Sequence, residues 1–218
     1  MSRVASPRPV PRAKLAEQWK PAILSLLLLG LVSGCVFPLL LFAIAGPLFP
    51  RQSQGSLVMR GGVVAGSKLI GQSFTRPEYF QCRPSAAGGG YDATSSGGTN
   101  LGPNNPKLTN GTANFAGIRQ LVEEYRKSNG LAPDAPVPVD AVTRSASGLD
   151  PHISTANAAL QVRRVARARG LREESVGRLV AEYTEGPQLG FLGNSRVWVL
   201  ELNLALDRFS SEAASASR

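Results

Sequence analysis

Three short clusters in this 218-residue chain combine residue types that could do chemistry. The first, Gly61-Gly-Val-Val-Ala-Gly-Ser-Lys68, comes close to a phosphate-binding P-loop, in which a lysine reaches the phosphates and the hydroxyl after it binds magnesium. Here Ser67 precedes Lys68, so each group would face the wrong target. We therefore expect this run to form a glycine-containing junction between a strand and a turn.

The second cluster pairs Asp150 with His152. An Asp–His pair can serve as a general base, but it needs a positioned nucleophile, and no recognisable nucleophile motif accompanies it. Asp150-Pro151 also suits the start of a helix, where the aspartate caps and the proline takes the first position. We favour the cap. Asp150 and Glu201 could also be ligands for a cation, although isolated acids are usually just solvated.

The third cluster lies in a polar run, Tyr91–Leu108, that is rich in Gly, Pro, Asn and Ser. Asp92 and Lys107 are its only side chains that ionise near neutral pH. Such a composition forms tight turns and presents amide and backbone groups rather than charge. Removing such a loop from water costs little free energy, which suits docking on another protein. A flexible linker is the alternative interpretation.

The net charge of +9 could indicate a protein that binds nucleic acid. A basic cluster precedes a second helical segment and superficially resembles a DNA-reading helix pair. Its members are Arg163, Arg164, Arg167, Arg169 and Arg172. Because a membrane anchor would keep this part of the chain from nucleic acid, we expect a solvated or partner-facing helix surface instead.

Hydrophobic periodicity predicts the elements that must position these residues. Helices are expected over Asn114–Lys127, His152–Arg169 and Arg172–Tyr183, and strands over Leu57–Ala65 and Arg196–Leu204. The first helix should stop at Asn129-Gly130. This mixture predicts an α+β domain in which helices pack on a small sheet.

A long apolar stretch, from Ala22 to Phe49, carries no charge. A helix over Ala22–Ala45 would be roughly 36 Å long, enough to span a bilayer with some tilt. Pro38 should kink this helix, and Gly46-Pro47 should end it. We interpret the stretch as one transmembrane helix.

The basic residues on the N-terminal side of this stretch set its predicted orientation. They are Arg3, Arg8, Arg12, Lys14 and Lys20, against the single acid Glu17. The positive-inside rule then places the N-terminus in the cytoplasm and residues 51–218 outside, with Trp19 as an interfacial anchor.

A second interpretation of the same stretch uses Val32-Ser-Gly-Cys35, which matches a bacterial lipoprotein cleavage box. Cleavage would leave an envelope lipoprotein lipidated at Cys35 that binds a small solute. Against this, residues 36–49 stay apolar where a mature lipoprotein normally has a polar tether, so we favour an uncleaved anchor. With Cys35 in the membrane and Cys82 in the domain, we expect no disulfide and no zinc site.

Five segments occur in an order and spacing that point to one family. They are Gly66–Gln72, Tyr79–Ala86, Ser96–Pro103, Ser145–Ser154 and Val199–Asn203. Together they resemble the small C subunit of the bacterial Kdp-type potassium-transporting P-type ATPase, from about Leu57 to Phe209. One departure is Gly193-Asn-Ser-Arg-Val-Trp-Val199, where the family often has Gly-(Glu/Gln)-Pro-Arg-Val-Asn-Val.

The resemblance implies an accessory subunit in the bacterial inner membrane. Its domains would be a cytoplasmic basic tail (1–20), a transmembrane helix (21–49), an extracytoplasmic α+β domain (50–209) and a disordered C-terminal tail (210–218). The chain lacks the Asp-Lys-Thr-Gly phosphorylation motif, so we expect no catalysis by this chain alone. Its implied partners are a channel-like potassium-binding subunit, a P-type ATPase subunit and membrane lipid, with no nucleic acid.

The family is described as a catalytic chaperone that strengthens ATP binding by the ATPase subunit. Ser95-Ser-Gly-Gly-Thr99 also resembles the Ser-Gly-Gly-Gln core of ABC-transporter signature loops. We expect no tightly bound cofactor or metal: ATP would act only through the ATPase subunit, and potassium would be the transported ion. For contact with partners, or for a nucleotide-related role, we select Ser96, Gly97, Gly98, Asn100, Asn104, Ser147, Asp150 and His152.

Overall fold

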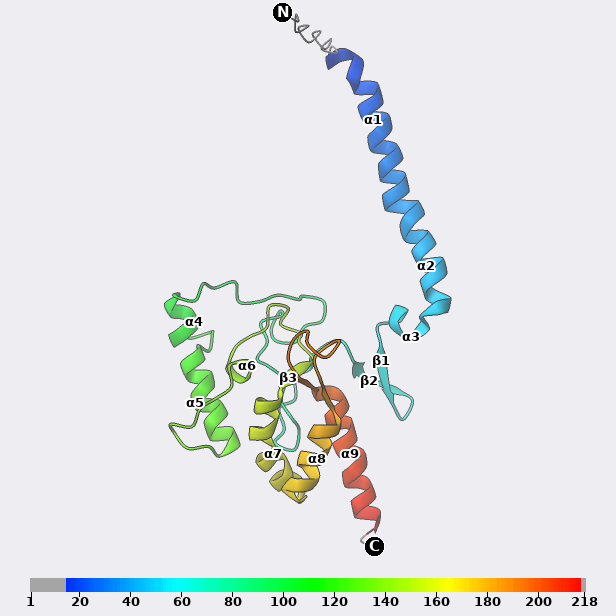
Figure 1. Cartoon of the computed structure of the whole chain (residues 1–218). Helices are drawn as coiled ribbons and strands as arrows, with labels where there is room; N and C mark the ends of the chain where they lie inside the picture. The colour runs from blue at the N-terminus through cyan, green and yellow to red at the C-terminus, as the bar shows by residue number, and fades with distance from the viewer. Residues whose placement is uncertain (1–14, 217–218) are drawn as a thin grey trace, which may run out of the picture. The chain divides into compact units, whose positions relative to one another are not determined.

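The computed structural model describes residues 15–216, so the basic side chains before Leu15 lie outside the described residues. The described chain forms two compact units, one ending at Gln54 and the other beginning at Gly55. Figure 1 shows the first as a long helical rod and the second as a folded domain of helices and short strands. The predicted α+β class, with one apolar N-terminal helix, is confirmed.

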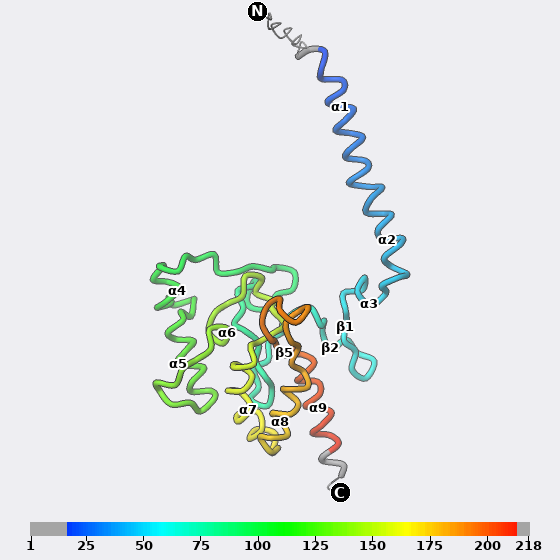
Figure 2. Tube along the Cα trace, viewed as in Figure 1, coloured from blue at the N-terminus to red at the C-terminus, as the bar shows by residue number. Residues whose placement is uncertain are grey.

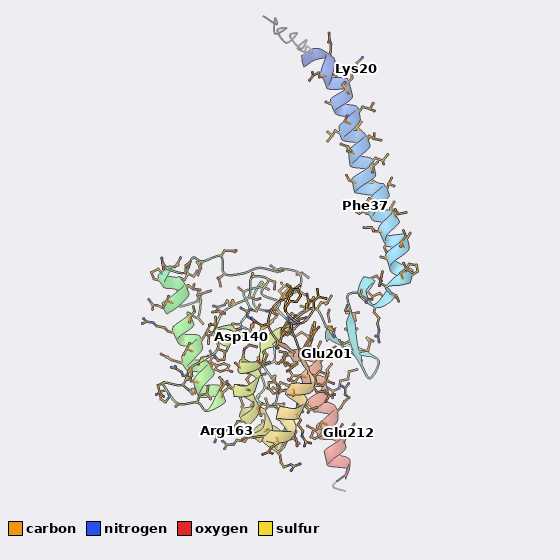
Figure 3. The ribbon with its side chains drawn as sticks, viewed as in Figure 1. Lys20, Phe37, Asp140, Arg163, Glu201 and Glu212 are labelled. Carbon is orange, nitrogen blue, oxygen red and sulfur yellow. The ribbon has the colours of Figure 1, made fainter. Side chains whose placement is uncertain are left out.

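The first unit contains a candidate membrane span, Glu17–Leu48, with a mean hydropathy of 2.6. It consists of α1 (Leu15–Leu31), a π-helical turn η1 (Val32–Val36) and α2 (Phe37–Leu48). Its side chains project from the helix on all sides (Figure 3), and none in the most apolar window is buried. An all-round apolar surface on an unburied helix is typical of a segment that is solvated by lipid.

The π-helical turn lies directly before Pro38, where we predicted a kink. A proline in a helix has no N–H to donate and its ring crowds the carbonyl four residues earlier. In η1 the backbone widens, and the Phe37 N–H donates to Val32 O, five residues back. Such a π-turn is an established way for a helix to absorb a local disruption.

The predicted end of this helix at Gly46-Pro47 was wrong. Helix α2 includes Pro47 and ends at Leu48, and Phe49 then leaves the helical conformation. Because Pro47 lies in the last turn, its missing N–H removes only one helical bond, while Phe49 N still donates to Ala45 O at 2.8 Å. A short helix, α3 (Pro50–Ser53), completes the unit.

The second unit begins with a hairpin, where we predicted a single strand over Leu57–Ala65. Strand β1 (Leu57–Arg60) pairs antiparallel with β2 (Val63–Ser67). Gly61 and Gly62 form the turn, both at positive φ, as a two-residue hairpin loop requires. The glycine-rich run is therefore a strand-to-turn junction, as expected, and Ser67 and Lys68 continue from β2 rather than opening a helix.

A three-stranded antiparallel sheet lies deeper in the domain, in the order β3–β5–β4. Its strands are β3 (His152–Ser154), β4 (Thr184–Glu185) and β5 (Arg196–Trp198). Three helices surround it: α7 (Thr155–Arg169), α8 (Glu173–Glu182) and α9 (Val199–Ala216). In Figure 2 these helices form the yellow-to-red half of the domain. Ile153 and Val197 of the sheet pack with Val165, Val176 and Leu202 in one apolar core.

Two predicted boundaries around this sheet were wrong. His152 does not open a helix. It begins β3, and the Ser154 side chain accepts from Asn157 N at 3.0 Å, which makes Ser154 the cap of α7. The predicted strand over Arg196–Leu204 stops at Trp198, and α9 follows. Val199, Leu202 and Leu206 are all fully buried, a spacing of three and four that belongs to a helix. Residues 210–216 continue this helix where we expected a disordered tail.

The other side of the domain is formed by α4 (Pro106–Asn110), α5 (Ile118–Asn129) and α6 (Val139–Val142). Helix α5 begins later than predicted. Asn114 lies in a turn that ends at Gly117, where a Cβ would be only 2.2 Å from Gly111 N. Its predicted end is correct, because Gly130 caps it with φ 64°. A second apolar cluster joins Tyr125 of α5 to Ala141 and Val142 of α6.

Between these two sides runs an extended segment without a strand partner. Phe80 is fully buried, and both of its backbone groups bind the side chain of Asn203 on α9, at 2.8 and 2.9 Å. The next residue, Gln81, does the same with Gln161 on α7, at 2.8 and 3.2 Å. Two buried amide side chains thus take the place of neighbouring strands.

We expect Asn203→Ala to destabilise the protein strongly, because it leaves the buried Phe80 N–H and C=O without partners. At roughly 1–3 kcal/mol for each unsatisfied group, the unfolding free energy should fall by about 2–5 kcal/mol despite the higher helix propensity of alanine. Urea unfolding of the full-length chain in detergent micelles measures this. Asn104→Ala, at an exposed position, is the control and should change stability by less than about 0.5 kcal/mol. Equal effects of the two changes would contradict the proposed role of Asn203.

Candidate functional site

The predicted loop Ser96-Gly97-Gly98 is held by the segment Ser145–His152. The Ser147 carbonyl oxygen accepts hydrogen bonds from Gly97 N and from the Ser96 hydroxyl, both at 2.9 Å. Gly98 lies so close that a Cβ there would be 3.0 Å from Ala146 O. The structure therefore brings together Ser96, Gly97, Gly98 and Ser147, which are about fifty residues apart in sequence.

Gly148 allows this close packing. Its φ is +68°, and a Cβ would lie 2.6 Å from Gly97 O and 2.7 Å from Ala87 N. The Gly148 carbonyl accepts from the Ser85 hydroxyl at 2.6 Å. Ser85 Oγ in turn accepts from Ala87 N and Tyr91 N, so the turn before the polar run is fixed to the same segment.

Asp150 and His152 are brought together as well, in a supporting position. Asp150 binds Arg83 at 3.0 Å, the His152 backbone N–H at 3.0 Å and His152 Nδ1 at 3.1 Å. Burial disfavours the carboxylate, but the hydrogen bonds from His152 and Arg83 outweigh it and lower the pKa of Asp150. Asp150 therefore caps a tight turn and not a helix, which corrects our prediction.

The environment of His152 does not suit base catalysis. Its ring packs edge-on against Trp198, with centroids 4.0 Å apart, and Nε2 is buried without a hydrogen-bond partner among residues 15–216. Within that described range no nucleophile is positioned on the ring. A pocket of about 230 Å³ beside the pair is lined by the side chains of Arg83, Asp140, Asp150, His152 and Arg196, among others.

Asn100 and Asn104 lie on the polar run, are exposed, and have no side-chain hydrogen bonds to residues 15–216. Asn100 takes φ 51°, a left-handed conformation that asparagine tolerates well. The structure thus separates the selected residues into a docked group, Ser96–Gly98 with Ser147, and two free amides further along the run. Together they form a surface that offers hydrogen bonds and little charge.

Our selection missed three residues that build this site: Arg83, Ser85 and Tyr91. Besides the contacts above, the Tyr91 hydroxyl donates to Arg83 O at 2.6 Å. Arg83 and Ser85 lie in the Arg-Pro-Ser-Ala motif that we used for the resemblance, so the signal was present. What it could not reveal was that these side chains bind the 145–150 segment.

Other charged candidates are paired within the domain. Glu201, considered as a cation ligand, lies 3.2 Å from Lys68. In the basic cluster, Arg164 donates to the carbonyls of Pro77 and Tyr79, and Arg169 binds Asp207 at 2.8 Å. Part of this cluster therefore stabilises the domain itself, where we expected a solvated or partner-facing surface. Arg163 remains exposed at the domain edge (Figure 3).

One candidate membrane helix followed by a single α+β domain is typical of a membrane-associated protein. A family model described as the c chain of the K+-transporting ATPase, KdpC, matches residues 19–208. The match covers the span and nearly the whole domain. This chain belongs to the KdpC family, and is a subunit of the potassium-transporting ATPase that supports potassium uptake.

Individual relatives agree with the family match. The KdpC subunit of the potassium-transporting ATPase of Mycobacterium tuberculosis strain H37Rv is 48% identical over 194 residues, which cover 89% of this chain and 100% of that protein. The KdpC subunit of Koribacter versatilis is 51% identical over 175 residues, covering 80% and 86%. That of Methylococcus capsulatus is 50% identical over 194 residues, covering 88% and 98%.

Gly148→Ala should disrupt the docking of the two loops, because the added Cβ meets backbone atoms and the residue needs positive φ. We expect the unfolding free energy to fall by about 2–4 kcal/mol, measured by urea unfolding of the full-length chain. Gly97→Ala is the matched control, since a Cβ there meets nothing within 4 Å. If both glycines tolerate alanine equally, the packing described for Gly148 is wrong.

The lowered pKa of Asp150 predicts a dependence of stability on pH. Because the folded pKa lies below the unfolded value of about 3.9, this group stabilises the fold at neutral pH and stops doing so as pH falls through the folded pKa. Asp150→Asn should therefore cost roughly 2 kcal/mol at pH 7, and this cost should shrink as the pH is lowered from about 5 toward about 2. Unfolding free energies measured across this range test it. Asp134→Asn, at an exposed position, is the control, and parallel curves for Asp150→Asn and the parent would contradict the prediction.

Proposed function

We propose that this protein is a non-catalytic accessory subunit that stabilises the assembly of a channel-like potassium-binding subunit with a P-type ATPase subunit. The observation that carries this proposal is the family match over residues 19–208, which includes both the anchor and the domain. The relatives are named as subunits of a potassium-transporting ATPase, so the partners belong to the same complex.

In this proposal the protein lies in the bacterial inner membrane with its N-terminus in the cytoplasm and its domain outside. Support comes from the basic N-terminal flank and from Trp19 and Lys20, which meet at the start of the span. The helix runs without interruption through Cys35 to Leu48. A lipoprotein cleaved at Cys35 would instead continue as a polar tether, so this continuity favours an uncleaved anchor.

The docking surface in this proposal is the group Ser96, Gly97, Gly98 and Ser147 with the exposed amides of Asn100 and Asn104. Uncharged donors and acceptors lose little on leaving water if the partner supplies hydrogen bonds. The loop is also fixed in advance by its bonds to Ser147, which reduces the entropy lost on binding. Asp150 and His152 follow Ser147 in the same segment, and Asp150 joins that segment to Arg83.

Any effect on ATP affinity would reach the ATPase subunit indirectly, through the anchor and the assembled interface. A domain outside the membrane has no access to cytoplasmic ATP, and the Gly61–Lys68 run is a hairpin. Isolated protein is accordingly expected to show no ATP turnover, and potassium is the ion that the whole complex transports.

Gly97→Arg tests the docking surface. A Cβ at Gly97 meets open space, so the arginine can be accommodated in the folded domain while projecting from the proposed surface. We expect loss of the two partner subunits from the complex purified through a tag on this chain, and poor growth of a strain carrying the variant at micromolar potassium. Ala132→Arg, on the exposed connector after α5, is the control and should behave as the parent.

The gene deletion tests the accessory role, and the Gly97→Arg variant tests the docking surface. If a strain lacking the gene grows normally at micromolar potassium while the other subunits are expressed, the accessory role itself is wrong. If that strain fails to grow but Gly97→Arg restores growth and recovers the full complex, the role stands and the docking surface lies elsewhere.

A further inference from the structure

Exposed aliphatic side chains gather on the β1–β2 hairpin. Leu57 is 51% exposed, Met59 57%, Val63 70% and Val64 50%. Leu69, just beyond the hairpin, is 57% exposed. Single exposed apolar residues are ordinary, but several on one short hairpin mark a surface that is covered by something other than water.

The pairing of the strands places part of this group on one face. Met59 is opposite Val64 across the ladder, and Leu57 lies two residues before Met59 on the same strand. Arg60 and Lys68 secure the hairpin to α9 through Asp207 and Glu201. The charged side chains therefore hold the hairpin on the domain, while the aliphatic face is left outward.

The chain itself restricts where this face can go. Phe49 alone separates the end of the candidate span from α3, and Gln54–Ser56 separate α3 from β1. Four steps from Ser53 to Leu57 reach at most about 14 Å. The chain therefore limits the distance between the end of α3 and the start of the hairpin, whichever side of the bilayer they face.

We propose that the aliphatic face of the β1–β2 hairpin rests in the lipid interface next to the membrane helix. Leu, Met and Val side chains without polar groups suit acyl chains, and Arg51 on α3 suits the phosphates of the headgroups. The outer edges of this two-stranded ladder still need water, so insertion stops at the level of the headgroups.

A contact with a protein partner fits this face less well. Buried centres of protein interfaces are enriched in aromatic residues, with directional hydrogen bonds, whereas the outward face of the hairpin carries Leu57, Met59 and Val64 and no aromatic side chain. The inference goes beyond the accessory role and depends only on the anchor spanning a bilayer. It would stand even if the docking surface at Gly97 were wrong.

Site-specific fluorescence tests the proposal in the full-length chain. Met59→Cys is made in a Cys35→Ser background and labelled with bimane. Burial raises the pKa of the remaining, half-buried Cys82 to about 12, so this thiol should label far more slowly at neutral pH than the introduced one. Vesicles of phosphatidylethanolamine and phosphatidylglycerol, with or without dibrominated acyl chains, hold the chain alone or the purified complex. Asp134→Cys, on the connector after α5, is the matched control.

The expected result is a blue-shifted emission at position 59, lost intensity in the brominated vesicles and protection from aqueous iodide, in both the free chain and the complex. The label at position 134 should show the reverse. Quenching by iodide at position 59 in both preparations would overturn the proposal. Protection from both quenchers in the complex alone would also overturn it, because a partner subunit would then cover the hairpin.

Discussion

The domain is organised around an extended segment that crosses its interior with no strand beside it. A buried backbone must have its N–H and C=O groups paired, and here the pairing is done by side chains. Asn203 binds both groups of Phe80, and Gln161 binds both groups of Gln81. Because these amides come from α9 and α7, each helix is fixed in rotation and position relative to the segment. The apolar core around Val165 and Leu202 then closes over it.

A second level of organisation depends on small residues. Loops from three parts of the chain approach the 145–150 segment at distances that exclude a side chain. A Cβ at Gly71 would be 2.4 Å from Asp150 O, and one at Gly148 would be 2.6 Å from Gly97 O. The result is a loop surface whose backbone is fixed although it lacks regular structure. For the docking proposed above, such fixation lowers the entropy lost on binding.

Several charged side chains form contacts within the domain, whereas the loop surface is nearly uncharged. Arg164 and Arg169 point into the domain's own structure, and Arg83 and Lys68 are matched by Asp150 and Glu201. The surface around Ser96–Gly98 has little charge of its own, and the hairpin after the anchor is aliphatic. These four basic side chains thus hold parts of the domain together, and the contacts proposed above with lipid and protein partners use its apolar and uncharged polar surfaces.

The sequence alone was sufficient for features that depend on composition and local period. The apolar span, the presence of helices α5, α7 and α8, the Gly130 cap and the family resemblance follow from residue types and spacing. It also grouped Ser96–Gly98 with Ser147, although only through that resemblance. It failed at two boundaries: Asp150-Pro151 was predicted to cap a helix that Ser154 caps, and Arg196–Leu204 was predicted as one strand although a helix begins at Val199.

Tertiary structure decided those cases. The Asp150 carboxylate is drawn to Arg83, from a loop 67 residues earlier, so Ser154 is left to cap α7. Asn203 must face Phe80, 123 residues away, so the chain after Trp198 coils into a helix that turns Val199, Leu202 and Leu206 toward the same core. The local sequence pattern cannot determine which residue caps α7 or where α9 begins. The partner residues that decide this are distant in sequence and meet only when the chain has folded.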